Sequence, residues 1–111
     1  MKKLIAIFVL VVFSEILNAA NFDACSVVDV RFGEGVNNGH VKFDCNLTGL
    51  PSCATATDFV AFDRGTDTGK QFLAMFTSAL AASLKVTGNV KSSCPTWQSN
   101  VASLSTLIVH K

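Results

Sequence analysis

Four cysteines carry the most definite chemistry in this sequence, and their spacing limits what that chemistry can be. Cys25, Cys45, Cys53 and Cys94 are separated by 19, 7 and 40 residues. Zinc sites use close-spaced pairs of the C-x₂₋₄-C kind, so these gaps exclude a metal centre of that type. Four cysteines in a short exported chain instead predict two disulfides, with three pairings open. We expect no metal and no cofactor.

A glycine-rich segment, Gly65–Gln71, resembles a phosphate-binding loop at first sight. The motif G-x-x-x-x-G-K-[ST] requires Gly where this chain has Arg64 and Ser or Thr where it has Gln71. The segment is therefore interpreted as the capped start of a surface helix.

The remaining candidates for catalysis are two histidines and two aspartates. We expect His40 in a turn and His110 near the chain end, neither beside a nucleophile, and oxidised cysteines cannot act as nucleophiles. Asp63 and Asp67 flank the expected helix start, where such residues serve as caps. The sequence thus predicts no enzyme.

Trp97 is the most informative of the ambiguous residues. It lies in a polar segment with Pro95, Gln98 and Asn100, which combines a flat apolar face with amide donors, as sugar sites do. Trp97 and Asn100 are therefore candidate glycan contacts. The alternative, in which Trp97 folds back to close one end of the core, remains open.

The N-terminus has the pattern of a secretory signal peptide. Lys2 and Lys3 precede ten apolar residues, 4–13, and the small pair Ala19 and Ala20 follows. Ten apolar residues are too few to cross a bilayer core about 30 Å thick. We expect a signal peptide over 1–20, one domain over 21–111, no membrane span, and a secreted or periplasmic location.

The charge of the mature chain excludes a further class of partner. Of nine basic and eight acidic residues, Lys2, Lys3 and Glu15 lie in the leader, which leaves seven of each sign. No basic stripe exists for phosphates, so we expect no nucleic-acid partner.

Alternating apolar residues predict three strands before the only helix. Segments 25–32 and 41–45 have the period of two of half-buried strands, and the turn-rich segment 33–39 joins them as an antiparallel hairpin. The inward residues expected are Val28, Val30 and Phe32 in the first strand and Val41, Phe43 and Cys45 in the second. A third strand is expected over 58–63, with Phe59 and Phe62 as its large apolar groups.

The helix is expected over about 68–83, because Thr68 and Gln71 have the spacing of a capping box. One apolar stripe, Phe72, Met75, Phe76 and Ala79, suffices to face a core. The second stripe is then free for self-association, through Leu73, Thr77 and Leu80. Two strands follow, over 84–88 and 101–109, the latter with Leu104 and Ile108 on one face.

The order β-β-β-α-β-β in about 90 residues is that of a small OB-like Greek-key barrel, here mainly β with one helix and stapled by disulfides. The runs S-V-V-D-V-R-F-G-E-G and V-K-F-D-C, with a second cysteine before F-x-x-F, resemble the B subunits of subtilase cytotoxin and typhoid toxin. The later runs F-V-A-F-D-R-G-T-D-T-G-K-Q-F, V-T-G-N-V and S-S-C also resemble a broader set of small exported bacterial proteins.

This resemblance implies a non-enzymatic binding module that recognises a host glycan or protein. It implies a ring of five copies together with a toxin A subunit, and a serine of the first strand, nearest to Ser26, that contacts the sugar. The chain ends at Lys111, without the cysteine-bearing tail of the toxin subunits. The alternative is a stand-alone exported protein with a structural or inhibitory role and no glycan site.

Two disulfide patterns compete. A hairpin centred on Gly49 would bring Cys45 opposite Cys53, as in the toxin B subunits, and leave Cys25 to pair with Cys94. The broader exported family implies the rival, Cys53 with Cys94, which leaves Cys25 with Cys45. Local geometry favours the first pattern at this stage.

Overall fold

The computed structural model describes residues 20–33 and 37–111, so the predicted leader lies outside the described residues except for Ala20. The elements confirm a mainly β chain with one helix in the expected order. They are β1 (Phe22–Phe32), β2 (Asn38–Phe43), β3 (Phe59–Asp63), α2 (Asp67–Ala82), β4 (Lys85–Val90) and β5 (Ala102–His110).

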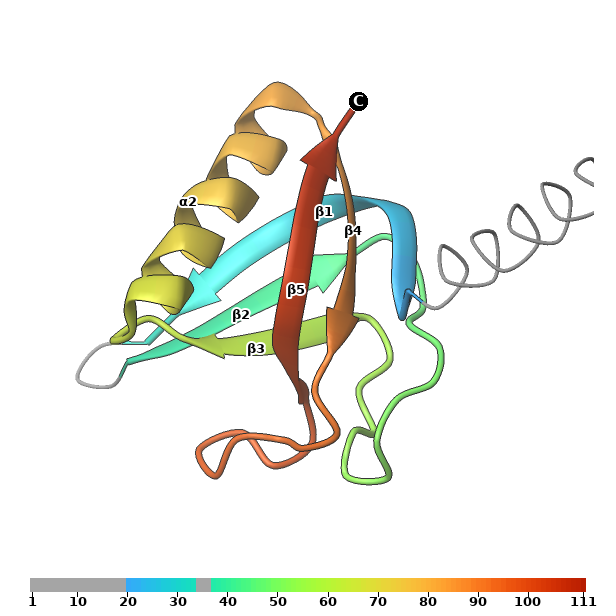
Figure 1. Ribbon diagram of the computed structural model, residues 1–111, viewed down its shortest axis with the longest axis vertical. Coiled ribbons are helices and arrows are strands. Elements are labelled where there is room, and N and C mark those ends of the chain that lie inside the picture. Colours follow the sequence, from blue (N-terminus) through green and yellow to red (C-terminus); the bar gives the residue numbers. More distant parts are fainter. Residues whose placement is uncertain (1–19, 34–36) are drawn as a thin grey trace, which may run out of the picture.

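The five strands pair in an order that closes on itself. The order is β1-β2-β3-β5-β4, a closed barrel in which β4 pairs again with β1. All pairs are antiparallel except β3 with β5, which are parallel and share only two residue pairs, Val60 with Ala102 and Ala61 with Ser103. Figure 1 shows α2 along one side of the strands and the β2–β3 and β4–β5 loops together at the opposite end from the C-terminus.

Strand β1 begins earlier than predicted, and its inward face changes along its length. Phe22, Cys25 and Val27 are buried, whereas Val28 is 48% and Phe32 62% exposed. A bulge between Val27 and Asp29 shifts the register with β2. An extra residue at a bulge breaks the period of two, so the predicted inward placement of Val28 and Phe32 is wrong.

Strand β2 confirms the predicted alternation, since Val41 and Phe43 are buried. In β3 the three successive residues 60–62 are all buried, so that strand does not alternate. Because successive residues of a strand face opposite sides, His40 and Lys42 lie on the outer face of β2. The expectation that His40 lies in a turn is therefore wrong, since β2 begins at Asn38.

Helix α2 starts one residue earlier than predicted and uses a different cap. Thr66, not Thr68, is the N-cap, and its hydroxyl accepts a hydrogen bond from the Gly69 backbone N–H at 2.9 Å. Thr68 is instead the second residue of the helix, where its own backbone is already helical and cannot cap. The helix ends at Ala82, and its C-cap residue, Ser83, has a left-handed φ of 54°.

The core is the contact between α2 and the interior of the barrel. The ring of Phe76, fully buried, lies 5.9 Å from those of both Phe43 and Phe62, and Phe22 stacks on Phe43 at 4.6 Å. Truncating a buried phenylalanine of this kind costs about 3–5 kcal/mol.

The favoured disulfide pattern is wrong, and the rival is the one observed. Cys25 pairs with Cys45, and Cys53 with Cys94, with Cα atoms 5.8 and 6.2 Å apart. Gly49 does not join two strands of a hairpin, because β2 already ends at Phe43 and β3 does not begin until Phe59. The pairing of Val27 with Phe43, carried two residues further, places Cys25 opposite Cys45.

The last two strands extend slightly past their predicted ends. Leu104 is buried while Ile108 is 60% exposed, so the prediction that they share a face is wrong. A register shift at Asn89/Val90 in the β4–β5 pairing accounts for the change. Within residues 20–33 and 37–111, no helix is long and apolar enough to cross a lipid bilayer.

Candidate binding site on the β4–β5 loop

The β4–β5 loop, residues 91–101, is anchored against the β2–β3 loop. The Cys53–Cys94 disulfide joins the two loops near one end. Near the other end, the Asn100 carbonyl accepts hydrogen bonds from the backbone N–H groups of Thr55 and Ala56, at 3.0 and 3.1 Å. The loop that carries Trp97 is therefore held at two points.

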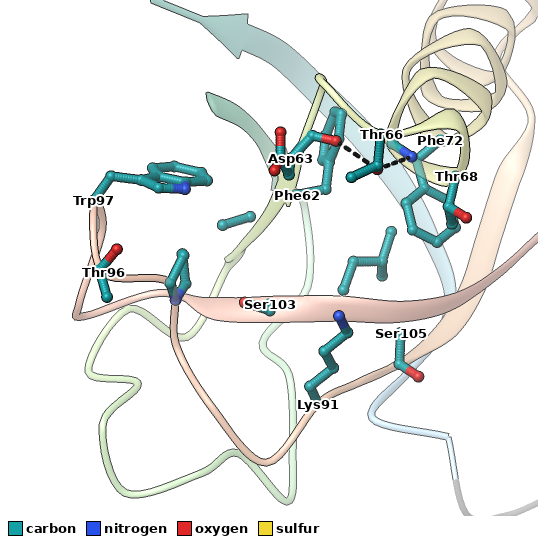
Figure 2. A pocket seen from close by; sticks show the side chains of 14 residues that line it. Phe62, Asp63, Thr66, Thr68, Phe72, Lys91, Thr96, Trp97, Ser103 and Ser105 are labelled. Atoms are coloured by element: carbon teal, nitrogen blue, oxygen red, sulfur yellow. Dashed lines mark hydrogen bonds between the residues drawn. The ribbon is translucent and has the colours of Figure 1, made fainter. Parts of the chain in front are cut away.

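Beside this loop lies a cleft of about 490 Å³. It exists because β3 and β5 pair over only two residues and then diverge. Trp97 bounds it at one end and Phe72 of α2 at the other, with β3 and β5 as its sides (Figure 2). Its volume falls within the range of about 300–1,000 Å³ that small-molecule sites occupy.

The cleft presents several polar side chains for which the described residues supply no partner. The hydroxyls of Thr68, Ser103 and Ser105, the ammonium of Lys91 and the indole N–H of Trp97 make no side-chain hydrogen bond or ion pair among the described residues. On the opposite side from Lys91, the Asp63 carboxylate accepts the Gly65 N–H at 2.8 Å. The charges of the lining are thus balanced, and its donors are available to a ligand.

Trp97 separates this cleft from a second depression. It is 36% exposed, and its ring meets that of His40 edge to face, with centroids 5.3 Å apart. Ala61, the neighbour of His40 on β3, is fully buried and lines the cleft. Trp97 neither enters the core nor stands free in solvent: it lines the cleft and contacts His40, which lines the second depression.

The second depression, here called the His40 hollow, has a volume of about 260 Å³ and lies on the outer face of the strands. Three strand residues line it: Arg31 of β1, its cross-strand neighbour His40 of β2, and Phe59 of β3. The loops add Ala56, Gln98, Asn100 and Val101.

The charged groups of the hollow are held in place. Arg31 pairs with Asp29 through Nε and Nη2, at 2.9 and 3.1 Å. The Arg31 guanidinium and the Lys42 ammonium lie 5.5 and 5.9 Å from the centroid of the Phe59 ring. Such cation–π contacts fix both cations at the margin of the hollow.

His40 has an unusual environment. Its Nε2 atom is buried and has no hydrogen-bond partner. Burial, with a smaller effect from the charge of Arg31, lowers the pKa of His40 below 6.5, and the Gln98 side chain acts in the opposite direction. The imidazole is therefore neutral at pH 7, with a nitrogen left unpaired beside the hollow.

The other candidate sugar contacts are only partly brought together. Asn100 lines the His40 hollow and not the cleft that Trp97 lines, and its Oδ1 accepts a hydrogen bond from Gln98 Nε2 at 2.7 Å. Ser26 is elsewhere: its hydroxyl accepts from the Lys85 ammonium at 2.7 Å, next to the Cys25–Cys45 disulfide. It lies five residues, or roughly 16 Å of strand, from Arg31.

The three residues expected at an oligomer interface also differ from one another. Leu80 is 42% exposed and Thr77 is exposed, with its hydroxyl donating to the Leu73 carbonyl at 2.7 Å. Leu73 itself is half-buried and packs against the core. Only Leu80 offers a large apolar surface to a partner.

Among the described residues, one group of potential metal ligands lies close together: Cys25, Asp44 and Cys45. Its two sulfur atoms are joined in the disulfide, so they offer no thiolate.

Comparisons of this chain with protein-family models, with curated proteins and with solved structures gave no match.

Sequence reasoning missed most of the residues that surround Trp97. Extending the alternation of β2 back to Asn38 would have placed His40 on the outer face of the strand. Its cross-strand partner on β1 is Arg31. Lys91, Ser103 and Ser105 carry no such signal, because they line the cleft only where β5 diverges from β3.

Proposed function

We propose that the protein is a secreted, non-enzymatic glycan-binding module with an OB-like barrel, similar in kind to the B subunits of bacterial toxins. Support for the OB-like assignment comes from the strand order β1-β2-β3-β5-β4 with a parallel β3–β5 pair. OB folds bind oligosaccharides on the β2–β3 face and on the β1–β2 and β4–β5 loops. The cleft borders the β4–β5 loop, and the His40 hollow includes residues of β2 and β3 beside the same loop, which supports the comparison.

The observation that carries the proposal is the cleft beside Trp97. An aromatic ring forms one end. Three hydroxyls and the Lys91 ammonium, which have no side-chain partner among the described residues, line the rest together with the Asp63 carboxylate. A sugar ring offers an apolar face and a circle of hydroxyls, which match a flat aromatic wall and hydrogen-bonding groups of both kinds. No nucleophile with an adjacent base lies in the cleft, so its groups suit binding.

The resemblance to toxin B subunits extends the proposal to assembly. We propose self-association through the exposed part of α2 around Leu80, with a ring of five and a catalytic partner subunit as the toxin-like form. Export to an oxidising compartment is part of the same proposal, and the two disulfides are compatible with it.

A glycan array with the oxidised protein tests the proposed function. The wild type is expected to bind a defined group of glycans, and Trp97→Ala to lose at least tenfold in affinity for them. Phe32→Ala is the matched control, because Phe32 is also an exposed aromatic residue but lies away from the cleft. Absence of signal from a folded wild-type sample would favour the stand-alone structural or inhibitory role.

A further inference from the structure

We infer that the His40 hollow is a separate subsite, which binds the carboxylate of an acidic sugar of the uronic-acid type. The inference rests on the proposed function, since it assigns the ligand class of the surface next to the cleft. It starts from a different observation, however: a buried nitrogen without a partner in a depression bordered by cations.

The arrangement of Arg31 supplies the first contact. A guanidinium has five N–H donors in a fixed fork. Asp29 takes one from Nε and one from Nη2, which leaves three donors on the outer edge of the group. Asp29 thus orients Arg31 and leaves three of its N–H groups, from which a ligand carboxylate can accept charge-assisted hydrogen bonds.

His40 supplies the second contact. Its Nε2 atom is buried without a hydrogen bond, which is costly, so a turn of the imidazole that brings Nε2 to a bound carboxylate would gain a hydrogen bond that the free protein lacks. When a carboxylate approaches, protonation of the imidazole turns Nε2 into a donor and removes the unpaired group. Ligand binding should therefore take up a proton.

The remaining lining selects a sugar over a small free anion. The Phe59 ring offers an apolar face, and the Asn100 amide, which accepts from Gln98 through Oδ1, keeps its two N–H donors for hydroxyl groups. The hollow of about 260 Å³ is smaller than a drug-sized site and fits a single sugar ring.

The charges that face His40 agree with this assignment. From β1 comes Arg31 with its partner Asp29, and from β2 itself Lys42. From β3 come Phe59 and Ala61, and from the β4–β5 loop Trp97, Gln98 and Asn100, none of which is charged. Among the described residues that border the hollow, cations therefore outnumber carboxylates.

The test compares glucuronate with glucose, which differ only in whether C6 is a carboxylate, and uses NMR titration of the His40 ring in the full oxidised protein. Glucuronate is expected to raise the pKa of His40 and to bind more tightly at pH 5.5 than at pH 8, by up to about tenfold for each unit of that rise. Glucose is expected to leave His40 unchanged. Arg31→Gln and His40→Gln should each abolish the difference between the two sugars.

Lys70→Gln is the matched control, because Lys70 is exposed on α2 and its loss changes the net charge as Arg31→Gln does. Equal binding of glucose and glucuronate, or an equal loss in Lys70→Gln, would overturn the inference. An equal response to acetate would also overturn it, since the sugar ring would then play no part. Failure of the proposed function looks different: no glycan would then perturb the amide signals of Thr68 and Ser103 in the cleft, whatever happens at His40.

Discussion

Removal of the Cys53–Cys94 disulfide is expected to damage both stability and the candidate site. The bridge spans a sequence separation of 41, and the Cys25–Cys45 bridge one of 20. In the chain-entropy model these loops correspond to about 4 and about 3 kcal/mol of stabilisation. With a urea m-value of about 1–2 kcal/mol/M, losing the first bridge lowers the unfolding midpoint by about 2–4 M.

The effect on Trp97 distinguishes the two bridges more sharply than stability does. The double variant Cys53→Ala/Cys94→Ala frees one end of the β4–β5 loop, where the backbone bonds to Asn100 remain as the other anchor. The Trp97 fluorescence of the folded variant is expected to shift to the red, since the ring loses its contact with His40. Trp97 is the only tryptophan of the chain, so the signal is unambiguous.

The matched control is Cys25→Ala/Cys45→Ala, which removes the bridge between β1 and the end of β2. It is expected to lower stability while leaving the emission of the folded state unchanged. Urea unfolding and fluorescence spectra of both variants provide the comparison. A red shift in the Cys25/Cys45 variant without one in the Cys53/Cys94 variant would refute the reasoning on loop anchoring.

Three further predictions concern single residues. Gly69→Ala is expected to destabilise the protein by about 2–3 kcal/mol, measured by thermal unfolding, because a Cβ atom there would clash with the carbonyl oxygen of Asp63; an unchanged melting temperature would contradict this. Because the pKa of His40 is lowered in the folded state, the unfolded chain binds the proton more readily, so stability should fall as pH falls below about 6.5 and level off above it. His40→Gln should flatten that part of the profile, and an identical slope in both proteins would show that His40 is not its source. Leu80→Lys is expected to leave a folded monomer if the wild type self-associates through α2, whereas light scattering that shows the same assembly in both would exclude this surface.

The sequence predicted the element order and the interior of β2 and α2 because each of these two segments keeps one regular period. Val41 and Phe43 alternate without interruption, and Phe76 and Ala79 lie on one helical stripe, so local pattern and tertiary burial agree. The helix start was displaced because Thr66 and Thr68 are both acceptable caps, and only the packing of Gly69 against Asp63 selects the first.

The faces of β1 and β5 could not be predicted, because a bulge leaves no mark in the residue pattern. The shift after Val27 exposes Val28, and the one at Val90 accompanies the exposure of Ile108. The disulfide pairing depended on whether the chain turned back at Gly49, which has a positive φ of 65° but begins no hairpin. A turn residue signals a local bend and does not determine which strand comes next.

The candidate site was predictable only at its centre. Trp97 and Asn100 were identified by composition, because a lone aromatic residue among amides is unusual in a loop. The rest of the cleft lining comes mainly from β3, α2 and β5, and the cleft depends on the divergence of β3 from β5. Leu73 was assigned to an interface by the helical pattern, but the core of this small barrel reaches far enough to cover it.

The central claim, that Trp97 and its cleft form the glycan contact, is tested most directly by mapping backbone amide shifts with the strongest glycan from the array. We predict that the largest shifts occur at the side-chain indole N–H of Trp97 and at the backbone amides of Thr68, Lys91 and Ser103. Shifts gathered instead around Ser26 and its neighbours on β1, with Trp97 unmoved, would contradict the account.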